Sequence, residues 1–279
     1  MGLSIDSALK HAATTLAGCH FITRARLEAE ILLSFVLEKE RVWLHTNDRQ
    51  KLDSSVQEQF LSLITRRAQG CPIEYLTHRA SFLDFELFVD SSVLIPRPES
   101  EILVQKVCEI LNHDQRPHLT LIEVGVGSGA LSIAIARALP HISIIATDIS
   151  PEALKTAARN IEYFGLQERI TLKHTTLFDT SDKADMVVSN PPYIASTYPI
   201  DKPLTYEPSS ALFGGIMGSE ILESLIAKCS AQKVPCLACE MGYDQRLHLA
   251  KVLESSCYNA QFYKDLAGLD RGFVARLQA

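Results

Sequence analysis

A regular alternation of strand-like and helix-like segments begins at Leu119, and this feature most constrains the fold. Short apolar runs rich in β-branched residues predict buried strands, and the longer segments between them carry apolar residues at helical spacing. The predicted strands cover residues 119–124, 142–146, 170–173, 186–189, 235–239, 258–263 and 272–277. This order predicts an α/β fold with a doubly wound, mainly parallel sheet, in which ligands bind at the carboxyl ends of the strands.

A glycine-rich turn follows the first predicted strand and reads Glu123-Val-Gly-Val-Gly-Ser-Gly-Ala130. Gly125, Gly127 and Gly129 let the backbone turn tightly and let a ligand approach without interference from a Cβ atom. Asp148 ends the second predicted strand, where an acid that binds ribose hydroxyls is expected. No Gly-Lys-Ser/Thr follows the glycines, so a Walker A loop is excluded. The pattern predicts a site for a nucleoside cofactor.

Two such cofactors fit the glycines and Asp148, namely a nicotinamide dinucleotide and S-adenosylmethionine. With Ala130, the glycines satisfy the dinucleotide fingerprint G-x-G-x-x-A. Glu123 favours S-adenosylmethionine, because its carboxylate would repel a pyrophosphate and suits the ammonium group of a methionine moiety. The loop after the fourth predicted strand favours the same cofactor.

That loop reads Asn190-Pro-Pro-Tyr193. The prolines lack N–H groups, and Asn190 stands before a proline and is therefore pushed to extended geometry. The loop is therefore expected to present hydrogen-bond acceptors, namely the Asn190 side-chain oxygen and the carbonyls of Asn190, Pro191 and Pro192. Two of these oxygens could accept the hydrogens of a planar –NH2 group that lies on Tyr193. The alternative is a proline-rich turn without chemistry, and the glycine loop upstream argues against it. Glu123 and the Asn190–Tyr193 loop together favour methyl transfer over hydride transfer.

The first 72 residues have a purely helical pattern. Helices are predicted over residues 3–17, after Thr23, over residues 40–45 and after Asp53. In the second helix, Leu27, Ile31, Phe35 and also Leu32 are expected to face inward. We therefore divide the chain into a helical substrate-recognition domain (1–72), a β-hairpin linker (73–92) and an S-adenosylmethionine-dependent methyltransferase domain (93–279).

Charge and hydropathy limit the partners. The formal net charge of −6 is the sum of +1 for residues 1–72 and −7 for the rest. Neither part is strongly basic, as a protein that neutralises many nucleic-acid phosphates would be. No signal peptide and no run of roughly 20 apolar residues is present. The seven scattered cysteines do not suggest a disulfide framework, and Cys236 and Cys239 are expected to be buried free thiols. We expect a cytoplasmic, monomeric protein without a metal and without membrane or direct nucleic-acid binding.

The chain resembles the HemK/PrmC-type protein-(glutamine-N(5)) methyltransferases, which modify peptide-chain release factors. The resemblance covers nearly the whole chain and includes the glycine loop and the Asn190–Tyr193 loop. The other segments that carry it are Leu94-Ile-Pro-Arg-Pro-Glu-Ser-Glu101, Tyr206-Glu-Pro-Ser-Ser-Ala-Leu212, Glu240-Met-Gly-Tyr-Asp-Gln245 and Lys264-Asp-Leu-Ala-Gly-Leu-Asp-Arg271. Arg97, within the first of these, is either a solvated charge or a group that braces the rim of the active site.

The resemblance implies a seven-stranded, Rossmann-like class I methyltransferase sheet that uses S-adenosylmethionine. Asp148 is expected on the ribose hydroxyls and Leu177 near the adenine. The implied cofactor-binding residues are Glu123, Gly125, Val126, Gly127, Ser128, Gly129, Asp148, Leu177 and Asn190. The chain departs from the family's usual residues at three positions: Thr176 replaces an aspartate, Glu123 an aspartate, and Val126 a threonine.

The implied substrate is the glutamine of the Gly-Gly-Gln loop in class I release factors, bound by Asn190, Pro191, Pro192 and Tyr193. An amide nitrogen is a poor nucleophile, because its lone pair is delocalised, so the enzyme contributes mainly orientation and hydrogen-bond acceptors. Asn190 Oδ1 and the Pro191 carbonyl are the expected acceptors and Tyr193 is the platform, so these three are the expected catalytic residues. An adenine-N(6) methyltransferase acting on DNA or RNA is the alternative enzyme, and a cofactor-free assembly module is the non-enzymatic one.

Overall fold

The computed structural model describes residues 2–278, which form two compact units. The first contains residues 2–79 and 200–206, and the second contains residues 80–199 and 207–278. The division at residue 79 lies inside the segment 73–92 that we interpreted as a linker. In the described part of the chain, no helix is both long and apolar enough to cross a membrane.

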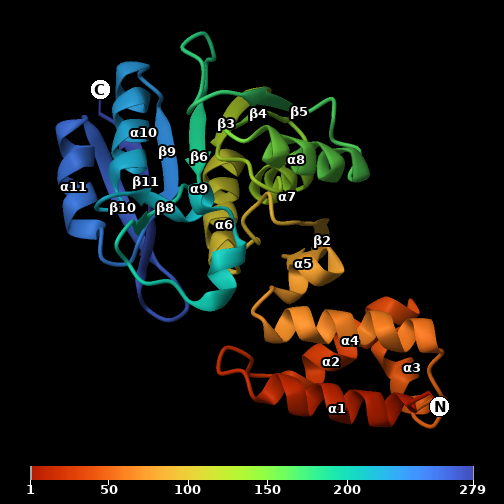
Figure 1. The fold of residues 1–279 in the computed structure, drawn as a ribbon. Coiled ribbons are helices and arrows are strands. Elements are labelled where there is room, and N and C mark those ends of the chain that lie inside the picture. Colours follow the sequence, from red (N-terminus) through yellow and green to blue (C-terminus); the bar gives the residue numbers. More distant parts are fainter. Residues whose placement is uncertain (1, 279) are drawn as a thin grey trace. The chain divides into compact units, whose positions relative to one another are not determined.

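The first unit is a helical bundle. Its helices are α1 (Ile5–Ala17), α2 (Ala25–Leu37), α3 (Arg41–Thr46), α4 (Ser54–Ala68), α5 (Ile73–Thr77) and the short 3₁₀ helix η1 (Lys202–Tyr206) (Figure 1). Leu9, Leu16, Leu32 and Phe60 are fully or almost fully buried in it. The hydroxyl of Tyr206 donates a hydrogen bond to the Gln69 carbonyl at 3.2 Å, which attaches η1 to the end of α4.

The inward face predicted for α2 is only partly right: Leu32 is buried as expected, but Phe35 is not. Ala29, Glu30, Leu32 and Leu33 are buried, whereas Phe35 is 38% exposed. The reason is Glu30, whose carboxylate accepts hydrogen bonds from Arg26 at 2.8 Å and Arg41 at 2.9 Å. These partners stabilise a charged residue on the inner face, and a hydrophobic pattern that counts Glu30 as exposed misplaces part of that face.

The second unit begins with the predicted hairpin, formed by β1 (Arg79–Phe82) and β2 (Phe85–Phe88), and continues with α6 (Glu99–Asn112). Its central element is a seven-stranded sheet of order β10-β11-β9-β6-β3-β4-β5. The strands are β3 (Leu119–Val124), β4 (Ile142–Asp148), β5 (Ile170–His174), β6 (Met186–Ser189), β9 (Cys236–Glu240), β10 (Tyr258–Lys264) and β11 (Asp270–Leu277). The seven strands run in the same direction except β11, which is antiparallel to both β10 and β9. The predicted strands and the doubly wound α/β fold are confirmed.

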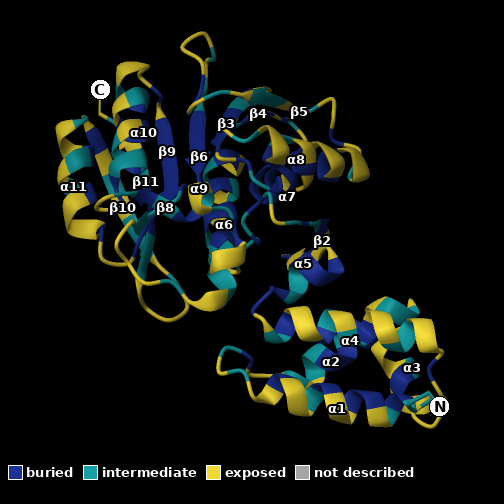
Figure 2. Ribbon diagram, viewed as in Figure 1, coloured by how far each residue is buried: buried dark blue, intermediate teal, exposed yellow. Residues whose placement is uncertain are grey.

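Helices cover both faces of this sheet (Figure 1). One face packs against α6, α7 (Ala130–Ala138) and α8 (Pro151–Tyr163), and the other against α10 (Glu220–Ala231) and α11 (Arg246–Ser255). Successive strand residues contribute to opposite cores, as Leu121 and Ile122 do, because side chains alternate along a strand. Figure 2 shows the resulting burial of the central strands. Cys236 and Cys239 are buried free thiols on opposite faces, as predicted.

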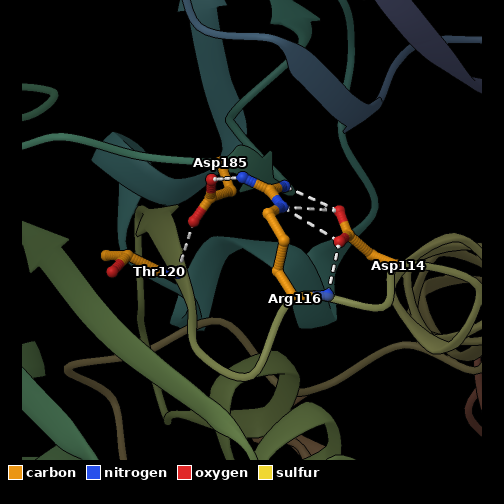
Figure 3. Close-up of polar contacts among 4 residues, drawn as sticks. All are labelled: Asp114, Arg116, Thr120 and Asp185. Carbon is orange, nitrogen blue, oxygen red and sulfur yellow. Dashed lines mark hydrogen bonds and ion pairs between the residues drawn. The ribbon is translucent and has the colours of Figure 1, made fainter.

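A charged cluster fixes the amino ends of β3 and β6 (Figure 3). The Arg116 guanidinium pairs with Asp114 and Asp185, and Asp185 Oδ2 accepts a hydrogen bond from the Thr120 N–H at 2.8 Å. The Arg116 hydrogen bonds lower the pKa of Asp114 to about 2. At their carboxyl ends, β3 leads into the glycine loop and β6 leads into Asn190. The charged cluster therefore holds these two strands together at the ends far from those loops.

Several elements are not anticipated by the sequence pattern. They are α5, α9 (Ser209–Leu212), α11 and the two-stranded parallel pair of β7 (Ile194–Ala195) and β8 (Phe213–Gly215). The β7–β8 pair directly follows the Asn190–Tyr193 loop and therefore connects this loop to the segment at residues 213–215.

Candidate active site

A cavity of about 300 Å³ opens at the carboxyl ends of β3, β4 and β6, at the low end of the size range of small-molecule sites. Most residues predicted at the cofactor or the substrate line it, namely Glu123, Gly125, Val126, Gly127, Ser128, Asp148, Leu177, Asn190, Pro191 and Pro192. Gly129 and Tyr193 are not among its lining residues. The structure thus brings together side chains from three strands that are widely separated in the sequence.

Backbone hydrogen bonds hold the glycine loop in place. The N–H groups of Gly125 and Val126 both donate to the Thr147 carbonyl at 2.9 Å, which joins the loop to the end of β4. Gly125 and Gly127 have φ angles of +79° and +52°, which favour glycine. A Cβ atom at either position would have no heavy atom within 4 Å, so both point into open space. A ligand can therefore approach this backbone closely.

Asp148 is held by two backbone donors. Its Oδ2 accepts a hydrogen bond from the Gly127 N–H at 3.0 Å, and its Oδ1 accepts one from the Ser150 N–H at 2.9 Å. Ser150 in turn caps α8, because its hydroxyl accepts from the Ala153 N–H at 3.2 Å. Each carboxylate oxygen retains a lone pair, so Asp148 can still accept hydrogen bonds from ligand hydroxyls.

Glu123 is a buried carboxyl at the end of β3. Its Oε2 accepts hydrogen bonds from the backbone N–H of Ser132, at 3.0 Å, and from the Ser132 hydroxyl. Burial raises the pKa of Glu123 to about 8, although the two Ser132 hydrogen bonds act in the opposite direction, and the nearby charge of Asp148 raises it further. A cation bound in the cavity would therefore favour the ionised form of this group.

The segment after β5 forms another wall of the cavity. Leu177 has a φ angle of +64°, which is uncommon for a residue with a branched side chain. Its carbonyl accepts a hydrogen bond from the Thr147 hydroxyl, and this contact holds the turn against β4. Thr176, where the family usually has an aspartate, lines the cavity and is exposed.

Asn190 follows β6 and has a defined side-chain orientation. Its Nδ2 donates to Ser100 Oγ on α6 at 3.0 Å, and no hydrogen bond reaches Oδ1 from the residues that the structure describes. The neighbouring Ser189 hydroxyl donates to the Val124 carbonyl at 2.6 Å and ties β6 to β3. The Tyr193 carbonyl accepts from Gln245 Nε2 at 3.0 Å. Burial raises the pKa of the Tyr193 hydroxyl, and the charge of Glu240 acts in the same direction.

Arg97 is not a free solvated charge. Its guanidinium pairs with the carboxylate of Glu207, which is almost fully buried and also accepts a hydrogen bond from the Ile95 N–H at 3.1 Å. Arg97 and Ser100 both line the cavity. Ser100 and Glu207 are not conspicuous as site residues in the sequence, although both lie in segments that carry the family resemblance. A sequence gives no sign that Ser100 meets Asn190, since 90 positions separate them.

Known proteins match this chain over most of its length. The family described as "PrmC N-terminal domain" matches residues 7–77, and the family described as "Methyltransferase small domain" matches residues 99–202. The release factor glutamine methyltransferase of Coxiella burnetii is 34% identical over 279 residues, which cover 98% of this chain and 99% of the relative. That of Xylella fastidiosa strain Temecula1 is 36% identical over 258 residues, which cover 90% of this chain and 93% of the relative.

A solved structure supports the fold independently. The human methyltransferase 10 domain containing protein superposes with a TM-score of 0.52 at 16% identity, over 78% of this chain and 99% of the human one. The identity is low, so this likeness concerns the fold alone. The matches at higher identity extend over both units, and the chain therefore belongs to the family of release factor glutamine methyltransferases.

Proposed function

We propose that this protein transfers a methyl group from S-adenosylmethionine to the side-chain amide nitrogen of the glutamine in the Gly-Gly-Gln motif of class I release factors. The observation that carries the proposal is the orientation of Asn190. Its Nδ2 is engaged by Ser100, so Oδ1 remains as an acceptor in a cavity that the glycine loop and Asp148 also line. An acceptor at that position suits a substrate –NH2 group.

S-adenosylmethionine is the methyl donor of this family, and the residues of the cavity fit it. When bound, it supplies an electrophilic methyl group on a positively charged sulfur. Asp148 would accept from the ribose hydroxyls, and Leu177 would lie against the adenine. Gly125 and Gly127 leave the open space that the cofactor needs. Glu123 would lie near the ammonium end, where a buried carboxyl is ionised most readily beside a positive charge.

The substrate amide would be held by the loop after β6. Asn190 Oδ1 and the Pro191 carbonyl would accept its two N–H hydrogens, and Tyr193 would be the platform for its plane. These acceptors gain strength as positive charge develops on the nitrogen, which is how fixed dipoles lower a barrier. Orientation of the nitrogen contributes the rest, and no strong base is needed, because the proton can leave after the methyl group is transferred.

The first unit would recognise the release factor. Support comes from its match to the PrmC N-terminal domain family and from its charge of only +1 over residues 1–72, which does not favour nucleic acid. The cavity described above is lined by residues of the second unit. We propose that the protein acts in the cytoplasm as a monomer and docks a folded protein substrate through this unit.

A methyltransferase for an exocyclic adenine amine is the second candidate, because the same acceptors would hold that –NH2 group. The near-neutral first unit and the acidic remainder favour the protein substrate. A filter assay with tritiated S-adenosylmethionine tests this, with release factor, DNA and RNA offered side by side. Label on the release factor alone is expected. Label on nucleic acid with none on the release factor would overturn the proposal.

A further inference from the structure

Two strongly exposed apolar side chains stand directly after β8. Ile216 is 76% exposed and Met217 is 75% exposed. A single exposed apolar side chain is ordinary in a folded protein, whereas a group of them beside a functional site marks a surface that a partner covers. The surroundings of these two residues therefore decide whether they belong to such a surface.

Close backbone packing places this segment against the loop expected to bind the substrate. A Cβ atom on Gly214 would lie 2.4 Å from the Pro192 carbonyl oxygen, and one on Gly218 would lie 2.5 Å from the Tyr193 carbonyl oxygen. Only glycine permits so close an approach. The two exposed residues lie between these glycines in the chain, so they flank the Asn190–Tyr193 loop.

The segment is also held by hydrogen bonds. The Met217 N–H donates to Glu220 Oε1 at 2.8 Å. The Gly215 carbonyl accepts from the N–H of Ser196 at 2.8 Å and from its hydroxyl at 2.7 Å. Ile221, one residue beyond Glu220, lines the cavity. The two exposed side chains are therefore presented near the cavity by a backbone that is already ordered, which lowers the entropy cost of binding a partner.

Two exposed tyrosines extend this surface. Tyr198 follows β7 as Ile216 follows β8, and because the two strands are parallel, both residues lie at the same end of the pair. Tyr243 precedes Gln245 by two residues, and Gln245 Nε2 donates to the Tyr193 carbonyl at 3.0 Å. We call these four exposed residues the apolar rim: Tyr198, Ile216, Met217 and Tyr243.

The position of the apolar rim determines what can cover it. The amide nitrogen of a glutamine lies only about 5 Å from its own Cα atom, by standard bond lengths. When the Asn190–Tyr193 loop holds that amide, the main chain that carries it must pass just outside the cavity, where the rim lies. The two glycines of the Gly-Gly-Gln motif have no side chains, so residues next to the motif must supply most of the apolar contact.

The charge of this surface favours a protein partner. Residues 190–201 and 207–227 contain no Lys or Arg, although a surface that binds nucleic acid needs cations for the phosphates. We propose that the apolar rim docks apolar side chains of the release factor next to its Gly-Gly-Gln motif and thereby guides the glutamine into the cavity. This role rests on the proposed function and names the surface that selects the substrate.

Ile216→Ser and Met217→Ser test this role separately, because both side chains are exposed and neither residue is among those that line the cavity. Each variant should raise the KM for release factor about 10-fold, as expected for losing the burial of one apolar side chain. The kcat at saturating release factor, the KM for S-adenosylmethionine and the melting temperature should stay unchanged. A general structural effect would lower kcat or the melting temperature as well.

Tyr163→Ser is the control. Tyr163 is 81% exposed and ends α8, which begins beyond the carboxyl end of β4 and returns toward the amino end of β5. It therefore lies at the opposite edge of the sheet from the cavity, and its replacement should leave the KM for release factor unchanged. An equal rise in this KM for Tyr163→Ser would overturn the proposal, because the effect would not be specific to the apolar rim.

Photo-cross-linking gives a readout that does not depend on activity. The protein with a benzophenone amino acid in place of Ile216 is irradiated in the presence of release factor, and mass spectrometry then locates the cross-link. We expect it within a few residues of the Gly-Gly-Gln motif, and none from the same probe in place of Tyr163. A cross-link confined to a remote surface of the release factor, or to a second copy of this chain, would contradict the docking role.

The kinetic outcome separates this role from the proposed function. If the wild type methylates release factor and both serine variants keep its KM, the role of the apolar rim is wrong and the proposed function stands. If the wild type transfers no methyl group to release factor, the proposed function is wrong, and this role fails with it.

Discussion

Asp148 Oδ2 accepts a hydrogen bond from the Gly127 N–H at 3.0 Å, so a carboxylate at the end of β4 holds the middle of the glycine loop that follows β3. The second oxygen of Asp148 is held by the Ser150 N–H. The side chain we expect on the cofactor's ribose therefore also shapes the loop that approaches the rest of the cofactor. The site is organised by its own hydrogen bonds, and removal of this carboxylate should disturb both functions.

Asp148→Ala should lower the affinity for S-adenosylmethionine by about 10- to 100-fold, as expected for losing hydrogen bonds to a charged group. Isothermal titration calorimetry measures this directly. Glu152→Gln is a suitable control, because it removes a nearby exposed carboxylate that forms an ion pair with Lys155. Equal affinities for wild type and Asp148→Ala would contradict the role of Asp148.

Gly127→Ala should weaken cofactor binding more than it weakens the fold. Its added Cβ would occupy open space beside the cavity, at a φ of +52°. Gly165 is a matched control, since it has a φ of +66°, equally open surroundings and a position outside the cavity lining. Each alanine should cost about 1 kcal/mol of unfolding free energy through backbone strain. Only Gly127→Ala should raise the dissociation constant of the cofactor, and a similar rise for both variants would refute this prediction.

Binding of S-adenosylmethionine should release a proton at pH 7. The pKa of Glu123 is raised to about 8 by burial, so this carboxyl is mostly protonated there. A cationic ligand beside it lowers that pKa, so the proton leaves, and affinity should rise with pH up to about 8. Calorimetry in buffers of different ionisation enthalpy measures the release. Glu123→Gln should release less, and identical proton release by the variant would exclude Glu123 as the source.

Asn190→Ala should lower kcat by about 100-fold, the typical effect of losing one hydrogen-bond partner in a transition state. The affinity for cofactor should change much less, because Asp148 and the glycine loop remain. Steady-state kinetics with release factor gives the first value and calorimetry the second. Unchanged methyl transfer by this variant would show that another group holds the amide.

The layout of the second unit follows from local sequence. β3 and β6 start and end as predicted, because β-branched residues favour strands and the glycines and prolines that follow stop them. The full inner face of α2 could not be predicted, since the burial of Glu30 depends on Arg26 and on Arg41, which lies outside the helix. The short β7–β8 pair joins residues about 20 positions apart and has no local pattern.

Some residues of the candidate site can likewise be predicted from local sequence, and others cannot. The glycine loop, Asp148 and Asn190 are conspicuous in the sequence, because each needs special residues at fixed spacing next to a strand end. Ser100 and Glu207 act through contacts between segments far apart in the chain. Only the folded structure brings these partners together, so sequence reasoning could mark their segments and not their roles.

Mass spectrometry of the release factor tests the central claim most directly. The protein is incubated with S-adenosylmethionine and a class I release factor, and the peptide that contains the Gly-Gly-Gln motif is then fragmented. We predict one added methyl group on the side chain of that glutamine, and its appearance about 100-fold more slowly when Asn190→Ala replaces the wild type. An unmodified glutamine, or a methyl group on another residue, would contradict the proposed function.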